Sequence, residues 1–247
     1  MRQKIWMLGI WLVGTTLSAA SDPLWLTRGE KLTYALSYLH VVAGTLELVA
    51  EPEGENLRLT MTATSTPAFS RIFPVNNRVV SVLARQPLTL IQQEAFIAEG
   101  KRRYVEVVTV HTERGMATRL RDGKERGQIK VQPPVLDTLG ALFALRGLDL
   151  APGRAFALDV LSGKEVYPLA VVVTGRQSLK VGGEKVPTFV VEPRFRQGGL
   201  YKGESKLLLY VTQDGRHTPV RIVSQLPFGA LTATLVGADP PWQEVVN

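Results

Sequence analysis

The chain has 247 residues, of which 45% are hydrophobic and 21% are charged, with a formal net charge of +7 and no cysteine. This length is sufficient for a single domain with its own apolar core. The absence of cysteine excludes disulfide bonds, thiolate metal sites and lipid attachment through a cysteine at a cleavage point. The chain must therefore be held together by packing and hydrogen bonding.

Residues 1–20 have the features of an export signal. Two basic residues precede an apolar run over 5–17, and Ser18-Ala19-Ala20 supplies the small residues that a signal peptidase needs. The run is short for a membrane span and the residues after Ala20 are polar, which favours cleavage over a retained anchor. We expect a signal peptide over 1–20, a single β-rich domain over 21–239 and a tail over 240–247. The protein should be periplasmic, with no stable membrane insertion after cleavage.

Alternating apolar and polar residues predict antiparallel strands over most of the first half. In the first strand, over 32–38, Tyr34 and Tyr38 share the apolar face with two leucines. Residues 66–74 contain two prolines and two phenylalanines, and we expect a single helical turn or an irregular corner there. Turn residues separate the further predicted strands, which cover 46–50, 57–64, 78–84, 88–97, 103–111, 116–121 and 125–131.

Residues 133–147 are the part of the chain after residue 20 with helical spacing. Leu136, Leu139 and Phe143 recur at i, i+3 and i+7, after a proline pair. Gly147 can adopt the left-handed conformation that ends a helix. Asp137 and Arg146 fall near the ends where their charges oppose the helix dipole. The spacing predicts a short central helix over 135–146.

Six more predicted strands follow this helix, over 155–160, 166–174, 186–193, 206–212, 219–226 and 230–237. The strand over 166–174 is nearly continuous in apolar residues, which predicts that both of its faces are covered. About fifteen β segments exceed what a flat sheet usually holds. The expected fold is all-β and mainly antiparallel, with a curved sheet forming a half-barrel or barrel around the helix.

The order of these features resembles the DUF3108 family of exported bacterial proteins of unknown function. The likeness rests on residues 29–34 leading to Ala43-Gly44, on the predicted helix, on the turn over 150–153 and on residues 215–220. The resemblance implies an exported, periplasmic, β-rich single domain. It implies no reaction and no catalytic residue.

The segment over 101–131 carries nine basic residues against four acidic ones. On the predicted strands, Arg119 and Arg121 share one face, and Arg126 and Lys130 share another. One interpretation is an ordinary solvated face. The other is a patch that attracts an anionic envelope component. Nucleic acid is not an expected partner of an exported protein, and the basic residues lack the interleaved aromatic residues of single-strand binding.

Sequence motifs for catalysis or metal binding are absent. His40, His111 and His217 do not form a recognised metal-binding pair, and there is no Gly-x-Ser-x-Gly or Ser-x-x-Lys. We expect no metal and no cofactor. Asp137 most simply accepts hydrogen bonds from the first turn of the helix, and Arg146 most simply faces the dipole at the other end.

Three functional hypotheses remain open. The first is a non-enzymatic binding or envelope-maintenance protein that holds an apolar or amphipathic, lipid-like molecule in the curved sheet, with Tyr34, Tyr38, Asp137 and Arg146 as candidate ligand contacts. The second is a hydrolase of an envelope polymer that uses Asp137 or another carboxylate with a histidine. The third is a structural interaction module. A cavity of a few hundred Å³ lined by leucines favours the first, and converging titratable groups favour the second.

Overall fold

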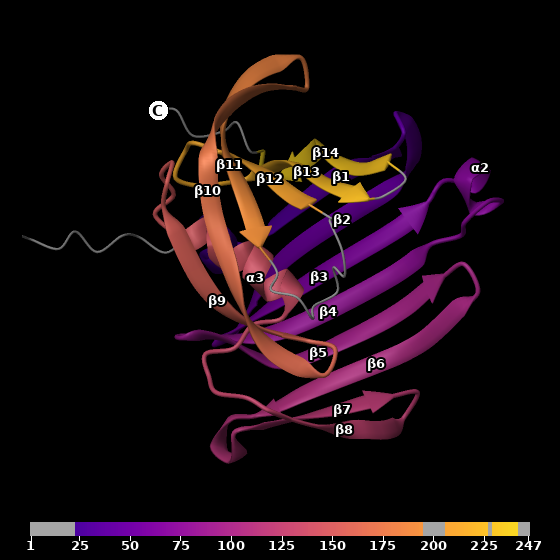
Figure 1. The fold of residues 1–247 in the computed structure, drawn as a ribbon, viewed down its shortest axis with the longest axis vertical. Helices are drawn as coiled ribbons and strands as arrows, with labels where there is room; N and C mark the ends of the chain where they lie inside the picture. The colour runs from indigo at the N-terminus through magenta and orange to yellow at the C-terminus, as the bar shows by residue number, and fades with distance from the viewer. Residues whose placement is uncertain (1–22, 195–205, 227–228, 242–247) are drawn as a thin grey trace, which may run out of the picture.

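A computed structural model describes residues 23–194, 206–226 and 229–241 (Figure 1). The predicted signal peptide and residues 242–247 of the predicted tail lie outside the described residues. The helices are α1 (Leu24–Thr27), α2 (Pro67–Ser70) and α3 (Thr138–Ala144), with 3-10 turns η1 (Thr112–Arg114) and η2 (Leu145–Gly147). The strands are β1 (Glu30–Tyr38), β2 (Val41–Glu53), β3 (Asn56–Ser65), β4 (Asn76–Arg85), β5 (Leu88–Glu99), β6 (Arg102–His111), β7 (Met116–Arg121), β8 (Lys124–Lys130), β9 (Ala155–Ser162), β10 (Glu165–Val181), β11 (Glu184–Arg194), β12 (Lys206–Thr212), β13 (Pro219–Leu226) and β14 (Gly229–Asp239).

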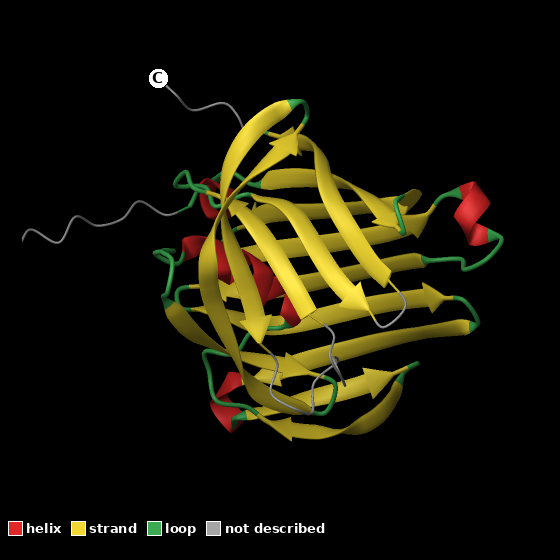
Figure 2. Ribbon diagram, turned by 45° about the horizontal axis from the view of Figure 1, so that its top comes forward, coloured by secondary structure: helices red, strands yellow, loops and turns green. Residues whose placement is uncertain are grey.

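All of these strands belong to one antiparallel sheet of fourteen strands, in the order β8-β7-β6-β5-β4-β3-β2-β1-β14-β13-β12-β11-β10-β9. Two meanders, β1–β8 and β9–β14, are joined where β1 pairs with β14. The sheet curves strongly around α3, and its two end strands, β8 and β9, are not paired with each other (Figures 1 and 2). The prediction of a mainly antiparallel, curved sheet with one short central helix is confirmed.

The alternation seen in the sequence separates an inner, apolar face from an outer face. Tyr34 lies opposite Leu46 on β2 and Leu235 on β14, so side chains of one face meet across three strands. The main core lies on this inner face, where α3 contributes Leu139 and Phe143. A smaller cluster, which includes Val108 and Ile129, packs against Leu161 at the end of β9. The helix thus covers part of the concave side of the sheet.

The helix begins later than the spacing predicts. Asp137 is its N-cap, and residues 135 and 136 lie before the helix, with Leu136 in a β-bridge to Val160. Their backbone bridges two distant parts of the sheet: Leu90 N donates to Val135 O at 2.7 Å, and Leu136 N donates to Asp159 O at 2.9 Å. Leu136 satisfies backbone groups of the edge strand β9, and Val135 accepts from β5, so the backbone of both residues is bonded to strands and not to the helix.

Two further local predictions are wrong. Strand β10 alternates between buried and exposed residues, with Pro168 and Ala170 exposed, so only one of its faces is covered. Gly147 does not end α3 in the left-handed conformation; it lies in η2, which closes with Leu148 N donating to Leu145 O at 3.2 Å. The expected helical turn within 66–74 is present as α2.

Candidate functional site

Asp137 is a fully buried carboxylate that holds the start of α3 against the sheet. One oxygen, Oδ1, accepts from Gly140 N at 2.7 Å, as the helix-capping prediction requires. The other, Oδ2, accepts from Ser81 Oγ on β4 at 2.5 Å and from Gln93 Nε2 on β5. Burial raises the pKa of Asp137 above its ordinary value, although these three hydrogen bonds oppose the shift. Both oxygens are therefore occupied by donors from the fold itself.

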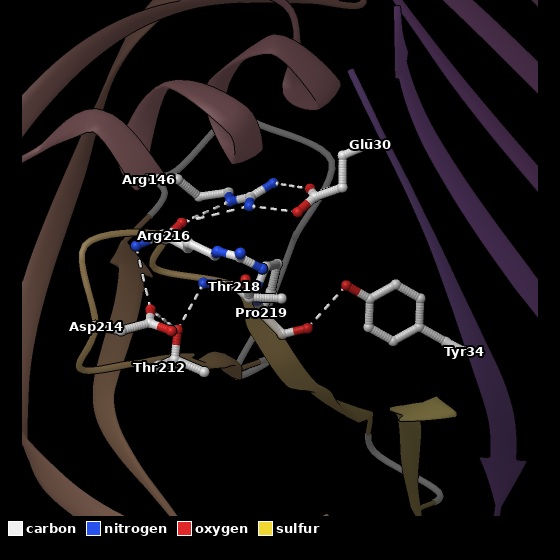
Figure 3. A network of polar contacts seen from close by, with 8 residues as sticks. All are labelled: Glu30, Tyr34, Arg146, Thr212, Asp214, Arg216, Thr218 and Pro219. Atoms are coloured by element: carbon white, nitrogen blue, oxygen red, sulfur yellow. Dashed lines mark hydrogen bonds and ion pairs between the residues drawn. The ribbon is translucent and has the colours of Figure 1, made fainter. Parts of the chain in front are cut away.

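Arg146 lies at the other end of the helix and is almost completely buried. Its guanidinium donates to both oxygens of Glu30 on β1, at 2.5 and 3.1 Å, and to Arg216 O at 3.3 Å (Figure 3). The guanidinium also faces the rings of Trp25 and Phe143, at 5.7 and 5.4 Å from their centroids. Arg146 is thus the charged centre of a junction between α1, η2, β1 and the loop before β13, and not only a partner of the helix dipole.

The loop before β13 is held so that the carbonyl group of Arg216 faces the Arg146 guanidinium. Asp214 Oδ1 accepts from Thr212 Oγ1 at 2.5 Å and from Arg216 N at 3.1 Å, and Thr212 Oγ1 in turn accepts from Thr218 N at 2.8 Å. His217 Nδ1 donates to Arg146 O at 2.9 Å. Figure 3 shows this network, without His217, beside Tyr34. It fixes the conformation of the loop and so the position of the buried guanidinium.

The two candidate tyrosines occupy different depths of the inner face. Tyr34 is fully buried, and its hydroxyl donates to Pro219 O at 2.8 Å. Burial raises the pKa of Tyr34 well above its ordinary value. Tyr38, four residues further along β1, is only half-buried. The structure therefore brings Tyr34 close to the Arg146 junction, whereas Tyr38 lies at the far end of the strand.

The cavity at the Arg146 junction is too small for an organic ligand. It measures about 10 Å³, which is the space of a single water molecule, between α1, the start of β1, Arg146, Arg216 and Pro240. The side chain of Arg216 also donates to Pro241 O at 2.7 Å, so the first residues of the predicted tail are attached to this junction. The geometry supports a structural role for Arg146 and Glu30.

A much larger cleft, of about 530 Å³, lies where the bridging residues cross between β5 and β9. Its walls come from the β4–β5 turn, the Pro133-Pro134 segment, α3 and β9. Gln132 and Asp159 are the polar members of its lining, and the apolar and proline members are Pro87, Leu88, Pro133, Pro134, Leu136, Ala144, Ala157 and Leu158. None of the four predicted ligand contacts lines it. Periodicity could not have located this cleft, because its walls meet only in the folded chain.

The predicted basic patch is divided between the two faces of the sheet. Arg119 is buried and donates to Glu106 at 2.6 Å; Arg121 donates to the same carboxylate at 2.8 Å. Burial alone would raise the pKa of Glu106, but the hydrogen bonds from both arginines outweigh it and lower this pKa. Arg126 and Lys130 are exposed on β8, where Lys130 neighbours the buried Ile129 and so points to the opposite face. The four residues do not form one surface.

Metal binding finds no support among the described residues, in which no cluster of three or more histidine, aspartate or glutamate side chains could hold an ion. Within the same residues, no helix combines the length and apolar character that crossing a bilayer requires. His111 contacts Thr118 and His217 contacts Arg146 O, so neither histidine is bonded to Asp137.

Comparisons with known proteins identify a family and a fold. A family model described as "Protein of unknown function (DUF3108)" matches residues 32–236. A crystal structure of a beta-barrel-like protein of domain of unknown function DUF1849 from Brucella abortus is similar with a TM-score of 0.55 and 8% identity. The similarity covers 85% of this chain and 96% of that chain, and it shows the fold alone. No curated protein matches the sequence.

Proposed function

Because the chain belongs to the DUF3108 family, whose description states no function, we propose a function from its geometry: a non-enzymatic binding protein of the cell envelope. The observation that supports this proposal is the 530 Å³ cleft lined mainly by leucine, alanine and proline. Its volume falls within the range of small-molecule sites, which combine apolar walls with a few polar groups. The ligand that fits it is an apolar or amphipathic molecule, with Gln132 and Asp159 available to a polar head.

The hydrolase hypothesis has less support. A general base must reach the proton that it removes, and it needs a pKa suited to that task. Asp137 is buried among donors from the fold, and it does not line the cleft. The binding hypothesis needs no reacting group and is therefore the one that we propose. The proposal includes export to the periplasm through residues 1–20.

The test compares ligand capture by the parent with capture by a variant whose cleft is filled. Ala157 is exposed and lines the cleft, so Ala157→Phe should occupy the site without disturbing the core. Ala155→Phe is the matched control, because Ala155 is exposed two residues earlier on the same strand and does not line the cleft. Each protein is purified after expression of the full sequence, and the small molecules that accompany it are identified by mass spectrometry.

The proposal expects an apolar or amphipathic compound with the parent and with Ala155→Phe, and a strongly reduced amount with Ala157→Phe. A fluorescent fatty acid should show the same order of binding in titration. Equal recovery and equal titration for all three proteins would exclude the cleft as the ligand site. N-terminal sequencing of the purified protein checks export separately: a chain that retains Met1 would contradict cleavage after Ala20.

A further inference from the structure

The large apolar side chains that the described surface exposes are concentrated at one end of the curved sheet. Ile72 is 81% exposed and Val41 is 64% exposed. Single exposed apolar residues are ordinary, but a group of them on one part of the surface marks an interaction site. The two exceptions, Phe96 and Val236, lie further along β5 and β14, away from the turns at this end. The apolar rim, as we define it, consists of Leu39, Val41, Val42, Ile72, Phe73 and Leu231.

Contacts between neighbouring segments make this rim continuous. The β1–β2 turn packs on β14, since Leu39 lies against Gly229 and Tyr38 is paired with Leu231. The end of β3 is tied to β2 by Thr66 N donating to Ala43 O at 2.8 Å. On the other side of α2, Gly100 N donates to Pro74 O at 2.8 Å, and the Phe73 ring lies over Gly100. In Figure 2, α2 projects from the molecule at the end opposite α3.

Basic side chains stand beside the rim. Arg71 directly precedes Ile72, Lys101 lies in the β5–β6 turn that Phe73 contacts, and Arg102 is the first residue of β6; all three are exposed. None of the three forms an ion pair with a residue in the described ranges. The nearby Glu99, the last residue of β5, accepts from Asn77 Nδ2 at 2.5 Å. The rim therefore combines exposed hydrocarbon with positive charge that is free to meet an anion.

The inner face of the sheet becomes more accessible toward the same rim. On β1, Leu32 and Tyr34 are buried, whereas Leu36 and Tyr38, which are nearer the rim, are half-buried. Strand β3 shows the same change from buried residues near its start to half-buried ones near its end. The helix α3 covers the inner face at the opposite end. A partner at the rim would therefore also face the accessible part of the concave apolar surface.

We propose that the apolar rim docks onto an anionic lipid bilayer. Exposed aliphatic and aromatic side chains gain free energy by entering the boundary between headgroups and acyl chains, and nearby Lys and Arg gain from lipid phosphates. A bilayer fits these observations because it can bury the apolar side chains of several separate turns and, at the same time, pair its phosphates with the basic residues beside them. The interaction goes beyond the proposed ligand binding, since it requires no occupant of the cleft.

The test is co-sedimentation with vesicles of phosphatidylcholine alone or with phosphatidylglycerol added, using protein expressed from the full sequence and its N-terminus determined by mass spectrometry. The apolar test variants are Val41→Glu and Ile72→Glu. Their matched control is Val236→Glu, because Val236 is 65% exposed but lies outside the rim. The charge test variant combines Lys101→Glu with Arg102→Glu. Its matched control combines Arg114→Glu with Lys130→Glu, because Arg114 and Lys130 lie at the opposite end of β6–β8.

Docking predicts sedimentation of the parent with the anionic vesicles, and weaker sedimentation at 1 M salt, where the Debye length is about 3 Å. Each apolar rim variant should bind about tenfold more weakly or worse, because one buried aliphatic side chain is lost and a charge is added. The control variants should sediment like the parent, and so should Ala157→Phe, which separates docking from capture in the cleft. The proposal would be overturned if the parent does not sediment with vesicles or sediments equally with neutral ones. It would also be overturned if the rim variants bind like the parent, or if only Ala157→Phe loses binding.

Discussion

The buried ion pair between Glu30 and Arg146 permits a quantitative prediction about stability. The side chains are 8% and 1% exposed, and they are joined by two hydrogen bonds. Glu30→Ala removes the carboxylate and leaves the guanidinium buried, with Arg216 O as its remaining acceptor and two aromatic rings as neighbours. Leaving one member of a buried pair uncompensated typically costs about 3–5 kcal/mol. The expected decrease in melting temperature is about 6–20 °C for a chain of this size.

A double-mutant cycle separates the interaction between Glu30 and Arg146 from the individual effects of the two substitutions. Arg146→Met leaves Glu30 uncompensated and should be destabilising for the same reason, whereas the combination of Glu30→Ala and Arg146→Met removes both charges. The double variant should therefore lose much less stability than the sum of the single variants. Chemical denaturation of the four proteins measures the coupling.

An exposed ion pair on the same molecule serves as the control. Arg154 and Asp149 form an ion pair at the surface, with side chains that are 48% and 87% exposed. Arg154→Met should change the free energy of unfolding by about 0–1 kcal/mol, because solvent screens exposed charges. If Glu30→Ala is no more destabilising than Arg154→Met, or if the two changes at the buried pair are additive, the reasoning about the junction is wrong.

Three further predictions concern α3 and the sheet. Leu139→Ala and Phe143→Ala should each lower the free energy of unfolding by about 2–5 kcal/mol by leaving a cavity under the helix; parent-like denaturation curves would make α3 peripheral. The raised pKa of Asp137 means that folding favours its protonated form. The free energy of unfolding of the parent should therefore fall relative to that of Asp137→Asn as the pH rises from about 4 through the native pKa. Parallel dependence of the two free energies on pH would contradict this. Gly44→Ala places a Cβ 2.2 Å from Thr64 O and should prevent stable folding or shift β2 from β3, whereas Gly175→Ala, with no atom within 4 Å, should be tolerated in thermal unfolding.

Local sequence patterns predicted most elements of this fold because local chemistry determines them. The period-two alternation of β1 and β3, and the turns between the strands, follow from side chains within a few positions of one another. The start of α3 is similar: Asp137 accepts from Gly140 N three residues later, which is a local interaction. The same logic failed at residues 135 and 136, where bridging hydrogen bonds to distant strands override the helical spacing.

The features that bear on function depend on contacts between distant residues. Glu30 meets Arg146 across 116 positions, and no local pattern marks either residue as a partner of the other. The alternation correctly placed Arg119 and Arg121 on one face. Only the folded sheet shows that this is the inner face and that both arginines form ion pairs with Glu106. The cleft likewise exists only where α3, β9 and the turn before β5 converge. Sequence periodicity determines which side of a strand is apolar, while pairing between distant strands decides what that side encloses and which end of it stays accessible.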